Sequence, residues 1–227
     1  MGKGKQVTGK CGFCDYETTR GRMAKHLAGC SERQVVMAKA EGGKAQQQTL
    51  YHLLVQDNWG GDFWLHLEMK GEAKLKHLDD YLRAIWLECC DHLSDFFIGR
   101  IWGDEVSKST PAAKIFSGGM ELFHVYDFGT SSETIIRVVD KREGKPLSTH
   151  PITLMARNNL PEMKCMECDQ PARWMCVECQ YEHEQSGFLC EKHVKKHPHD
   201  EYGEPLAIVN SPRLGMCGYD GPAEPPY

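Results

Sequence analysis

The sequence has no long hydrophobic run, and this absence excludes a helix that spans a membrane. Apolar residues make up 41% of the 227 residues, but no stretch approaches the roughly 18 consecutive apolar residues that such a helix needs. The basic, glycine-bearing start, residues 1–10, has no apolar stretch behind it, so we expect no secretory signal peptide. We therefore predict a cytoplasmic protein without a membrane partner.

Recognisable catalytic motifs are also missing. No nucleophile motif, phosphate-binding glycine loop or His-Glu metal helix accompanies the ionisable residues of the middle region. Asp104, Glu105, His124 and Asp127 lie near expected strand or loop ends, where such groups can bind a divalent cation or act as acid and base. Solvated loop acids and capping groups are the simpler interpretation. A metal-dependent enzyme acting on nucleic acid or nucleotides is thus the alternative function, with the catalytic residues unassigned.

Cysteine is scarce in the middle of the chain and concentrated towards its ends. Reduced thiols prevail in the cytoplasm, so the eleven cysteines are interpreted as metal ligands or free thiols and not as disulfides. The middle region holds only Cys89 and Cys90. These form a poor metal pair if they lie on a helix, because adjacent helical residues diverge; Cys89 is then a core residue.

The middle region, residues 45–157, shows the patterns of an α+β domain. Residues 51–56 and 63–69 read as two strands, the second half-buried, joined by a turn that contains Gly60-Gly61. Apolar residues at three- and four-residue spacing from Leu75 to Leu93 predict one long amphipathic helix of roughly 20 residues. Residues 121–128 and 134–140 form a second hairpin pattern, and residues 152–156 are a further strand.

Motifs in residues 50–157 resemble the plasmid pRiA4b ORF-3-like family. They are the helix motif from Leu75 to Trp86 and on to Phe96, the pair Asp104-Glu105, and the strand end Tyr126-Asp127-Phe128-Gly129. The resemblance implies an α+β fold more firmly than an activity. Members of the family are often encoded in mobile elements. The family commonly has Asp and Trp after Phe-Gly, where this chain has Thr130 and Ser131.

The first cysteine cluster has the spacing of a zinc finger. Cys11-x2-Cys14 places two thiolates on one tight turn, and His26-x3-Cys30 puts two ligands on one helix face, which completes a tetrahedron. So short a segment folds mainly because metal binding drives it. We predict a CCHC zinc finger in residues 1–44.

The finger region is basic, whereas the rest of the chain is acidic. Residues 1–44 carry a formal charge of +5 and the remainder −10. Arg22 and Lys25 fall at base-reading positions of a finger helix, with Arg20 beside them. One finger reads only about three base pairs, so contact with the nucleic-acid backbone or help to a partner protein is the expected use. A solvated helix face is the alternative.

A second cluster occupies residues 158–210 and supplies eight ligands in pairs, enough for two tetrahedral zinc ions. The run Cys165-x2-Cys168-x7-Cys176-x2-Cys179-x10-Cys190-x2-His193-x3-His197-x-His199 resembles a B-box. That resemblance implies that one ion is held by Cys165, Cys168, Cys190 and His193, and the other by Cys176, Cys179, His197 and His199. His183, in the long gap before Cys190, is an alternative to either of the last two histidines. B-boxes serve mainly as protein-interaction surfaces.

The tail, residues 211–227, contains Cys217 between Gly215 and Gly218. This thiol is either reactive or packed against the core, and a disordered end is the alternative. The chain is thus predicted to be a zinc-binding, non-enzymatic interaction protein of mobile-element type. It would hold three zinc ions, bind another protein, and contact nucleic acid through the finger.

Overall fold

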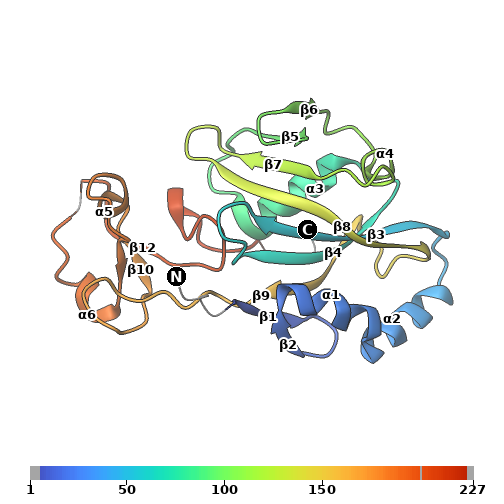
Figure 1. Cartoon of the computed structure of the whole chain (residues 1–227), viewed down its shortest axis with the longest axis horizontal. Helices are drawn as coiled ribbons and strands as arrows, with labels where there is room; N and C mark the ends of the chain where they lie inside the picture. Colours follow the sequence, from blue (N-terminus) through green and yellow to red (C-terminus); the bar gives the residue numbers. More distant parts are fainter. Residues whose placement is uncertain (1–5, 200, 224–227) are drawn as a thin grey trace.

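The structure is a computed structural model that describes residues 6–199 and 201–223. It has an α+β fold, as the sequence predicts. Among the described residues, nine antiparallel strands form one sheet in the order β2-β1-β9-β4-β3-β8-β7-β5-β6, and three short strands form a second sheet in the order β11-β10-β12. Figure 1 shows the small sheet with α5 and α6 at one end of the long axis. No helix in these ranges is both long and apolar enough to cross a membrane.

The central strands follow the predicted hairpins. β3 (Gln48–Asp57) pairs with β4 (Trp64–Lys70), and β7 (Leu122–Tyr126) pairs with β8 (Ser132–Gly144). β9 (Ile152–Asn158) pairs with β4, while β5 (Ser94–Ile98) pairs with β7 and with the edge strand β6 (Asp104–Val106). Both predicted hairpins and the extra strand are confirmed.

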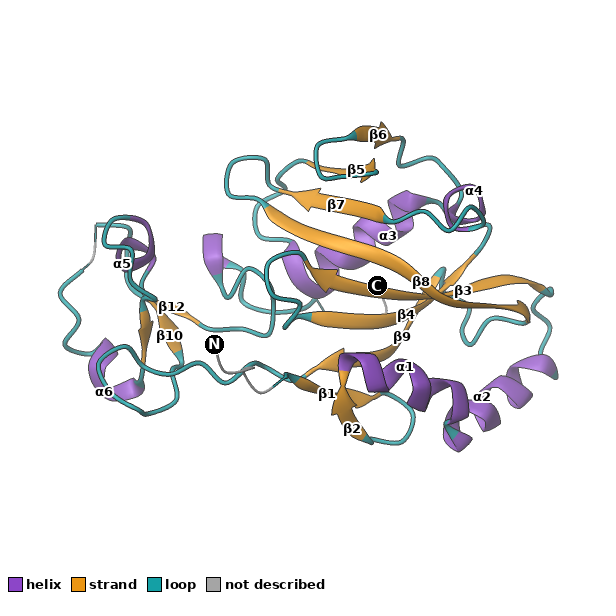
Figure 2. Ribbon diagram, in the orientation of Figure 1, coloured by secondary structure: helices purple, strands orange, loops and turns teal. Residues whose placement is uncertain are grey.

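The finger joins the main sheet as an added edge. β1 (Thr8–Cys11) pairs with β9 on one side and with β2 (Glu17–Thr19) on the other. The helices α1 (Arg20–Gly29) and α2 (Ser31–Glu41) follow, and they lie beside the sheet in Figure 2. Because β1 pairs with β9, the finger is part of the main sheet.

The finger also explains why β4 is buried on both faces, where the alternation predicted a half-buried strand. Leu65 and Leu67 belong to the main core, as expected. On the other face Trp64 packs with Met23 and Leu27 of the finger. Glu68 lies between Arg142, 2.9 Å away, and Arg33 of α2, 3.8 Å away. The second face is therefore covered by apolar contacts and buried ion pairs that strand alternation alone does not reveal.

The predicted long helix is wrong in its length. α3 (Leu75–Leu82) continues only through the π-helical segment η1 (Arg83–Leu87), and Glu88 already has an extended conformation. The Arg83 side chain contacts the carboxylates of Glu88 and Asp91 at 2.6 and 2.7 Å and donates to the His92 carbonyl at 2.8 Å. These contacts fold residues 88–92 back over the helix end, so Leu93 is exposed.

The remaining elements are short. α4 (Ala112–Phe116) packs on the main core through Ile115 and Phe116. The small sheet contains β10 (Trp174–Met175), β11 (Phe188–Leu189) and β12 (Leu206–Ala207), with α5 (Val177–Tyr181) and α6 (Glu191–Val194) beside it. The tail then returns to the main body and forms the 3-10 turn η2 (Met216–Gly218).

Candidate metal centres

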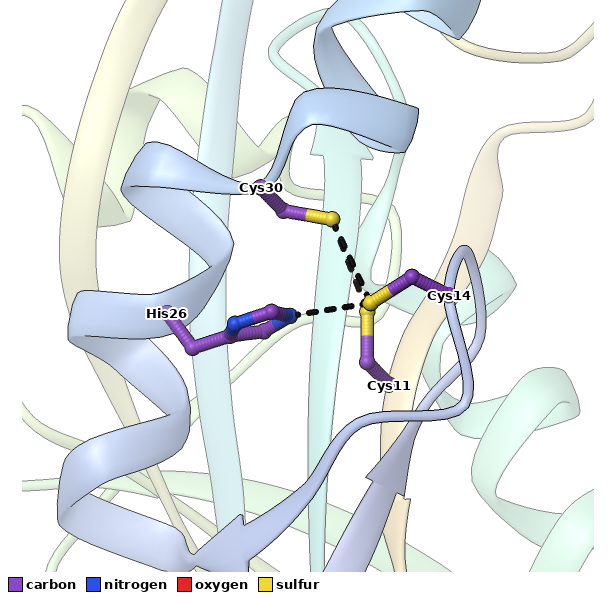
Figure 3. A group of neighbouring side chains, drawn as sticks. All are labelled: Cys11, Cys14, His26 and Cys30. Carbon is purple, nitrogen blue, oxygen red and sulfur yellow. Dashed lines mark hydrogen bonds between the residues drawn. The ribbon is translucent and has the colours of Figure 1, made fainter.

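The four ligands predicted for the finger come together at the junction of β1, α1 and α2. Cys11 is the last residue of β1, Cys14 lies on the turn that follows, His26 lies on α1, and Cys30 lies between the two helices. Figure 3 shows their side chains pointing toward one another. One ligand atom from each residue lies within 4.8 Å of all the others. The ring of Tyr16 stacks on His26 with centroids 4.5 Å apart, which fixes the imidazole plane.

The spacing of these atoms suits a zinc tetrahedron. With Zn–S bonds of about 2.3 Å, two sulfurs on a tetrahedral ion lie about 3.8 Å apart. The Sγ atoms of Cys14 and Cys30 are 3.6 Å apart, and those of Cys11 and Cys30 are 4.0 Å apart. His26 Nε2 lies 3.3 Å from Cys14 Sγ. The arrangement therefore fits an ion at its centre with all four positions filled by protein.

The C-terminal module gathers two further ligand groups in the interleaved order that the B-box resemblance implies. The first is Cys165, Cys168, Cys190 and His193, and the second is Cys176, Cys179, His197 and His199. In the first, the Cys168 and Cys190 sulfurs are 3.8 Å apart. In the second, Cys179 Sγ lies 3.3 Å from His197 Nε2 and 3.1 Å from His199 Nδ1. Both groups fit a four-coordinate ion.

His183 lies next to the second group without replacing a member of it. Its ring centroid is 4.6 Å from that of His199, and its Nε2 lies 3.8 Å from the carboxylate of Glu178. Glu178, His183 and His199 also form a group of potential ligands. The closer Cys179 contacts of His197 and His199 favour these two as the ligands.

Two buried thiols of these groups, Cys11 and Cys179, resist ionisation without a metal. Burial raises the pKa of Cys11 to about 11, and burial together with a hydrogen bond to Cys176 raises that of Cys179 to about 12. A divalent cation reverses this preference because it binds the thiolate. Metal binding should therefore release protons and stabilise the folded segments.

The central acids named as possible catalytic groups are not gathered into one of the metal-ligand groups of the described residues. Asp104 and Glu105 lie on the edge strand β6 and are exposed. His124 is fully buried and lies 2.8 Å from Asp79. Asp127 accepts hydrogen bonds from Arg213 and from two backbone N–H groups.

Asp79 is the centre of the buried polar network around His124. It also accepts from Lys108 at 2.8 Å and from Ser94 at 2.7 Å. Burial by itself would raise the pKa of this carboxyl, but the hydrogen bonds from His124, Lys108 and Ser94 outweigh it and hold the pKa well below its usual range. Both carboxylate oxygens of Asp79 have hydrogen-bond partners and its side chain is only 6% exposed, which favours a stabilising role for it.

The three basic residues proposed for nucleic-acid contact differ in their surroundings. Arg22 and Lys25 are exposed on α1. Arg20 instead donates to the carbonyl of Gly61 at 2.6 Å, in the turn between β3 and β4. Its guanidinium is therefore engaged within the fold, and Arg20 is less exposed than Arg22 and Lys25.

A fourth cluster, which the sequence patterns did not reveal, contains Cys89, Cys90, His92 and Cys217. The side chains of Cys89 and Cys90 would diverge if both residues lay on a helix. The helix ends at Leu87, so the two sulfurs can approach to 3.8 Å. The histidine partner of Cys217 is His92, 125 residues away, and Nε2 lies 3.5 Å from Sγ. The only sequence signal was the short run Cys89-Cys90-x-His92, which has no second half nearby.

The comparisons with known proteins leave the family open. No family model matches the chain, and no curated protein matches it. A solved structure from Methanosarcina mazei Go1, a protein of unknown function called MM3350, is similar with a TM-score of 0.40 and 19% identity. The match covers 47% of this chain and 68% of that one. At this level the similarity supports no argument about fold or activity, so both family resemblances rest on the residues quoted for them.

Proposed function

We propose that this chain is a non-enzymatic zinc-binding protein whose terminal modules serve as interaction surfaces. The observation that carries the proposal is that each of the three predicted ligand groups offers four protein ligands within 4.8 Å. Catalytic zinc sites usually have three protein ligands and leave a position for water, whereas structural sites are closed. Three closed sites favour zinc as a support for surfaces.

The arrangement of the central acids supports the same choice over a metal-dependent enzyme. Asp104 and Glu105 are on an edge strand, while His124 and Asp127 are each engaged by other residues. An acid–base pair needs groups within hydrogen-bond reach of one reacting atom. His124 and Asp127 have separate partners, and Asp104 and Glu105 are exposed on the edge strand. The pRiA4b ORF-3-like resemblance is therefore kept only as a proposal about family and mobile-element origin.

The partner of the C-terminal module is proposed to be another protein. The module lies at one end of the molecule in Figure 1. It exposes the aromatic rings of Tyr181 and Tyr202, and tyrosine is enriched at protein interfaces. The B-box resemblance of its ligand pattern supports an interaction role. Zinc would hold these rings in position, because the module has only a small apolar cluster of its own.

A pull-down with the full chain tests this role. The variant Cys176→Ser/Cys179→Ser removes one ion of the module, and Cys14→Ser removes the finger ion as a matched control. We expect the intact chain and the Cys14→Ser control to capture a specific partner protein. The variant Cys176→Ser/Cys179→Ser should fail to capture it. Capture that is equal for all three would contradict a docking role of the module.

The finger is proposed to contact nucleic-acid phosphates through Arg22 and Lys25. Such contacts are electrostatic and weaken with salt. We expect duplex DNA binding, followed by fluorescence anisotropy at several salt concentrations, to fall in Arg22→Ala/Lys25→Ala and to stay unchanged in Lys114→Ala, an exposed lysine of α4. Binding that is unaffected by the finger substitutions would remove nucleic acid from the proposal.

A further inference from the structure

The tail crosses from the C-terminal module back to the central domain and is fastened there by buried side chains. Ser211 donates to the carbonyl of Trp86 at 2.6 Å, and Tyr219 donates to that of Ile85 at 2.8 Å. Arg213 is 2% exposed and bonds Asp127 at 3.1 Å. The segment 211–219, which we call the strap, therefore has a defined path over the end of η1. The alternative of a disordered tail thus does not hold for residues 211–219.

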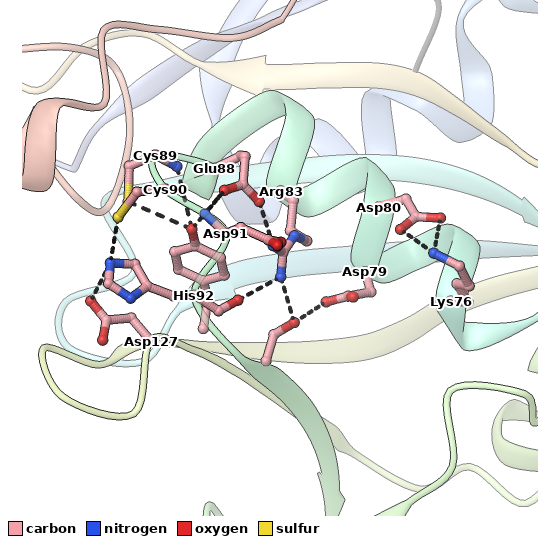
Figure 4. A network of polar contacts seen from close by, with 12 residues as sticks. Lys76, Asp79, Asp80, Arg83, Glu88, Cys89, Cys90, Asp91, His92 and Asp127 are labelled. Atoms are coloured by element: carbon pink, nitrogen blue, oxygen red, sulfur yellow. Dashed lines mark hydrogen bonds and ion pairs between the residues drawn. The ribbon is translucent and has the colours of Figure 1, made fainter.

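The strap places Cys217 next to residues 89–92, which follow η1. Its Sγ lies 3.5 Å from the Sγ of Cys90 and 3.5 Å from His92 Nε2. Cys90 Sγ is in turn 3.1 Å from His92 Nε2 and 3.8 Å from Cys89 Sγ. Figure 4 shows Cys89, Cys90 and His92 together at the end of the helix, next to Asp127. All four ligand atoms lie within 4.8 Å of one another, as in the other three groups.

The backbone on both sides of this cluster is held in an uncommon conformation. Asp91, between Cys90 and His92, has a φ of 59°, and Cys217 itself has a φ of 58°. A residue other than glycine in this left-handed region costs of order 1 kcal/mol or more, and such strain persists only where surrounding contacts impose it. Here the contacts of Arg83 hold one side, and the buried anchors of the strap hold the other. The turns at Asp91 and at Cys217 thus bring the side chains of Cys90, His92 and Cys217 together.

From these observations we infer a fourth zinc site, formed by Cys89, Cys90, His92 and Cys217, which pins the strap to the central domain. Three thiolates and an imidazole are a common structural zinc set, and the sulfur separations of 3.5 and 3.8 Å suit Zn–S bonds of about 2.3 Å. Asp127 lies beside this set: its Oδ2 is 3.5 Å from His92 Nε2 and 3.1 Å from Arg213, and its Oδ1 accepts from backbone N–H groups.

The site would act on the position of the C-terminal module. The strap is separated from the end of β12 by three residues, and its Met216 accepts a hydrogen bond from Tyr181 of α5 at 3.6 Å. Pinning Cys217 therefore restrains the module against the central domain. Because Cys90 and Cys217 are exposed, this ion should be the first of the four to be lost to a chelator.

Metal analysis of the full chain tests the inference. Protein purified under reducing conditions is expected to hold four zinc ions per chain by native mass spectrometry. Cys217→Ser and His92→Ala should each hold three, and the control His150→Ala, an exposed histidine outside the ligand groups, should hold four. Cys217 is exposed and the His92 side chain is 31% exposed. Circular dichroism with an unchanged melting profile of the core would show that the variants are folded.

Other numbers of zinc ions per chain would contradict the inference, and each number has a different meaning. Three ions in the wild type, unchanged in Cys217→Ser and His92→Ala, would overturn the fourth site and leave the three predicted sites intact. Four ions retained in both variants would also overturn it. A Cys90–Cys217 disulfide found by non-reducing peptide mapping would show that the pair is a redox couple instead. A chain with no zinc at all would overturn the proposed function as well.

Discussion

At the scale of single residues, two buried histidines make the stability of the fold depend on pH. His52 Nε2 and His66 Nδ1 lie 2.8 Å apart on neighbouring strands. Burial lowers the pKa of His52 to about 3 and that of His66 to about 4. Both rings are therefore neutral in the folded state at pH 7, and one donates its N–H to the other.

This pair predicts a loss of stability in mild acid. The unfolded chain binds protons near pH 6.5, while the folded chain resists them down to about pH 4, so the free energy of unfolding falls as the pH drops through that window. The variant His52→Leu/His66→Leu should show a shallower fall in urea denaturation between pH 7 and 5. Equal slopes for the two proteins would refute the assignment.

The Asp79 carboxylate is the second residue with a large expected effect. Removing one partner of a buried ion pair leaves the other charge uncompensated, at a cost of about 3–5 kcal/mol. Lys108 keeps 28% of its side chain exposed, so we expect Asp79→Ala to lower the free energy of unfolding by about 3 kcal/mol, at the lower end of that range.

The matched control is Asp80→Ala on the same helix. Asp80 forms an exposed pair with Lys76, and such pairs contribute at most about 1 kcal/mol. Because the pKa of Asp79 is depressed in the fold, its contribution is complete above about pH 4 and is lost on further acidification. Equal costs for the two substitutions in urea denaturation at pH 7 would contradict the network.

At the scale of elements, the finger should be the part of the main body that depends most on metal. Its buried apolar contacts with the sheet include Met23 and Leu27, which pack in one cluster with Trp64, Met155 and Ala156. Full burial of such side chains stabilises by about 1.5–3 kcal/mol each. Metal binding in zinc fingers contributes about 10–16 kcal/mol, so zinc and not packing decides whether the segment is ordered.

Hydrogen exchange measures this dependence. After chelation, amides of β1, α1 and α2 should exchange at least tenfold faster, while β3 and β8, which pair with each other in the sheet centre, stay protected. The variant Cys14→Ser should reproduce the change without a chelator. Protection of the finger that survives both treatments would mean that packing alone orders it.

The elements also show what the sequence could and could not predict. Strand alternation and glycine turns identified the hairpins, because those signals are local. The length of the helix was overestimated because Arg83 ends it through contacts with Asp91 and His92 that apolar spacing does not record. The buried second face of β4 was missed for the same reason, since the finger that covers it is remote in sequence.

At the scale of the whole molecule, zinc ligands were predictable wherever they lie close together in the chain. The finger and the C-terminal module have both halves of each ligand group within 30 or so residues, at spacings set by turns and helices. The fourth cluster joins Cys90 to Cys217 across 127 residues. Its second half is brought in by the buried anchors of the strap, and only the fold reveals them.

In this account, each ion joins separate elements of the fold. The finger ion joins β1 to α1 and α2, and the two ions of the module support a small sheet of two-residue strands. All eleven cysteines of the chain belong to one of the four groups, together with five histidines. The ligand atoms around zinc should therefore be sulfur and nitrogen, with more sulfur than nitrogen.

X-ray absorption at the zinc edge of the purified full chain measures that shell directly. The account predicts four-coordinate zinc with sulfur at about 2.3 Å, a smaller number of nitrogens at about 2.0–2.1 Å and no water ligand. A six-coordinate shell of oxygen, or a folded protein that binds no zinc, would contradict it.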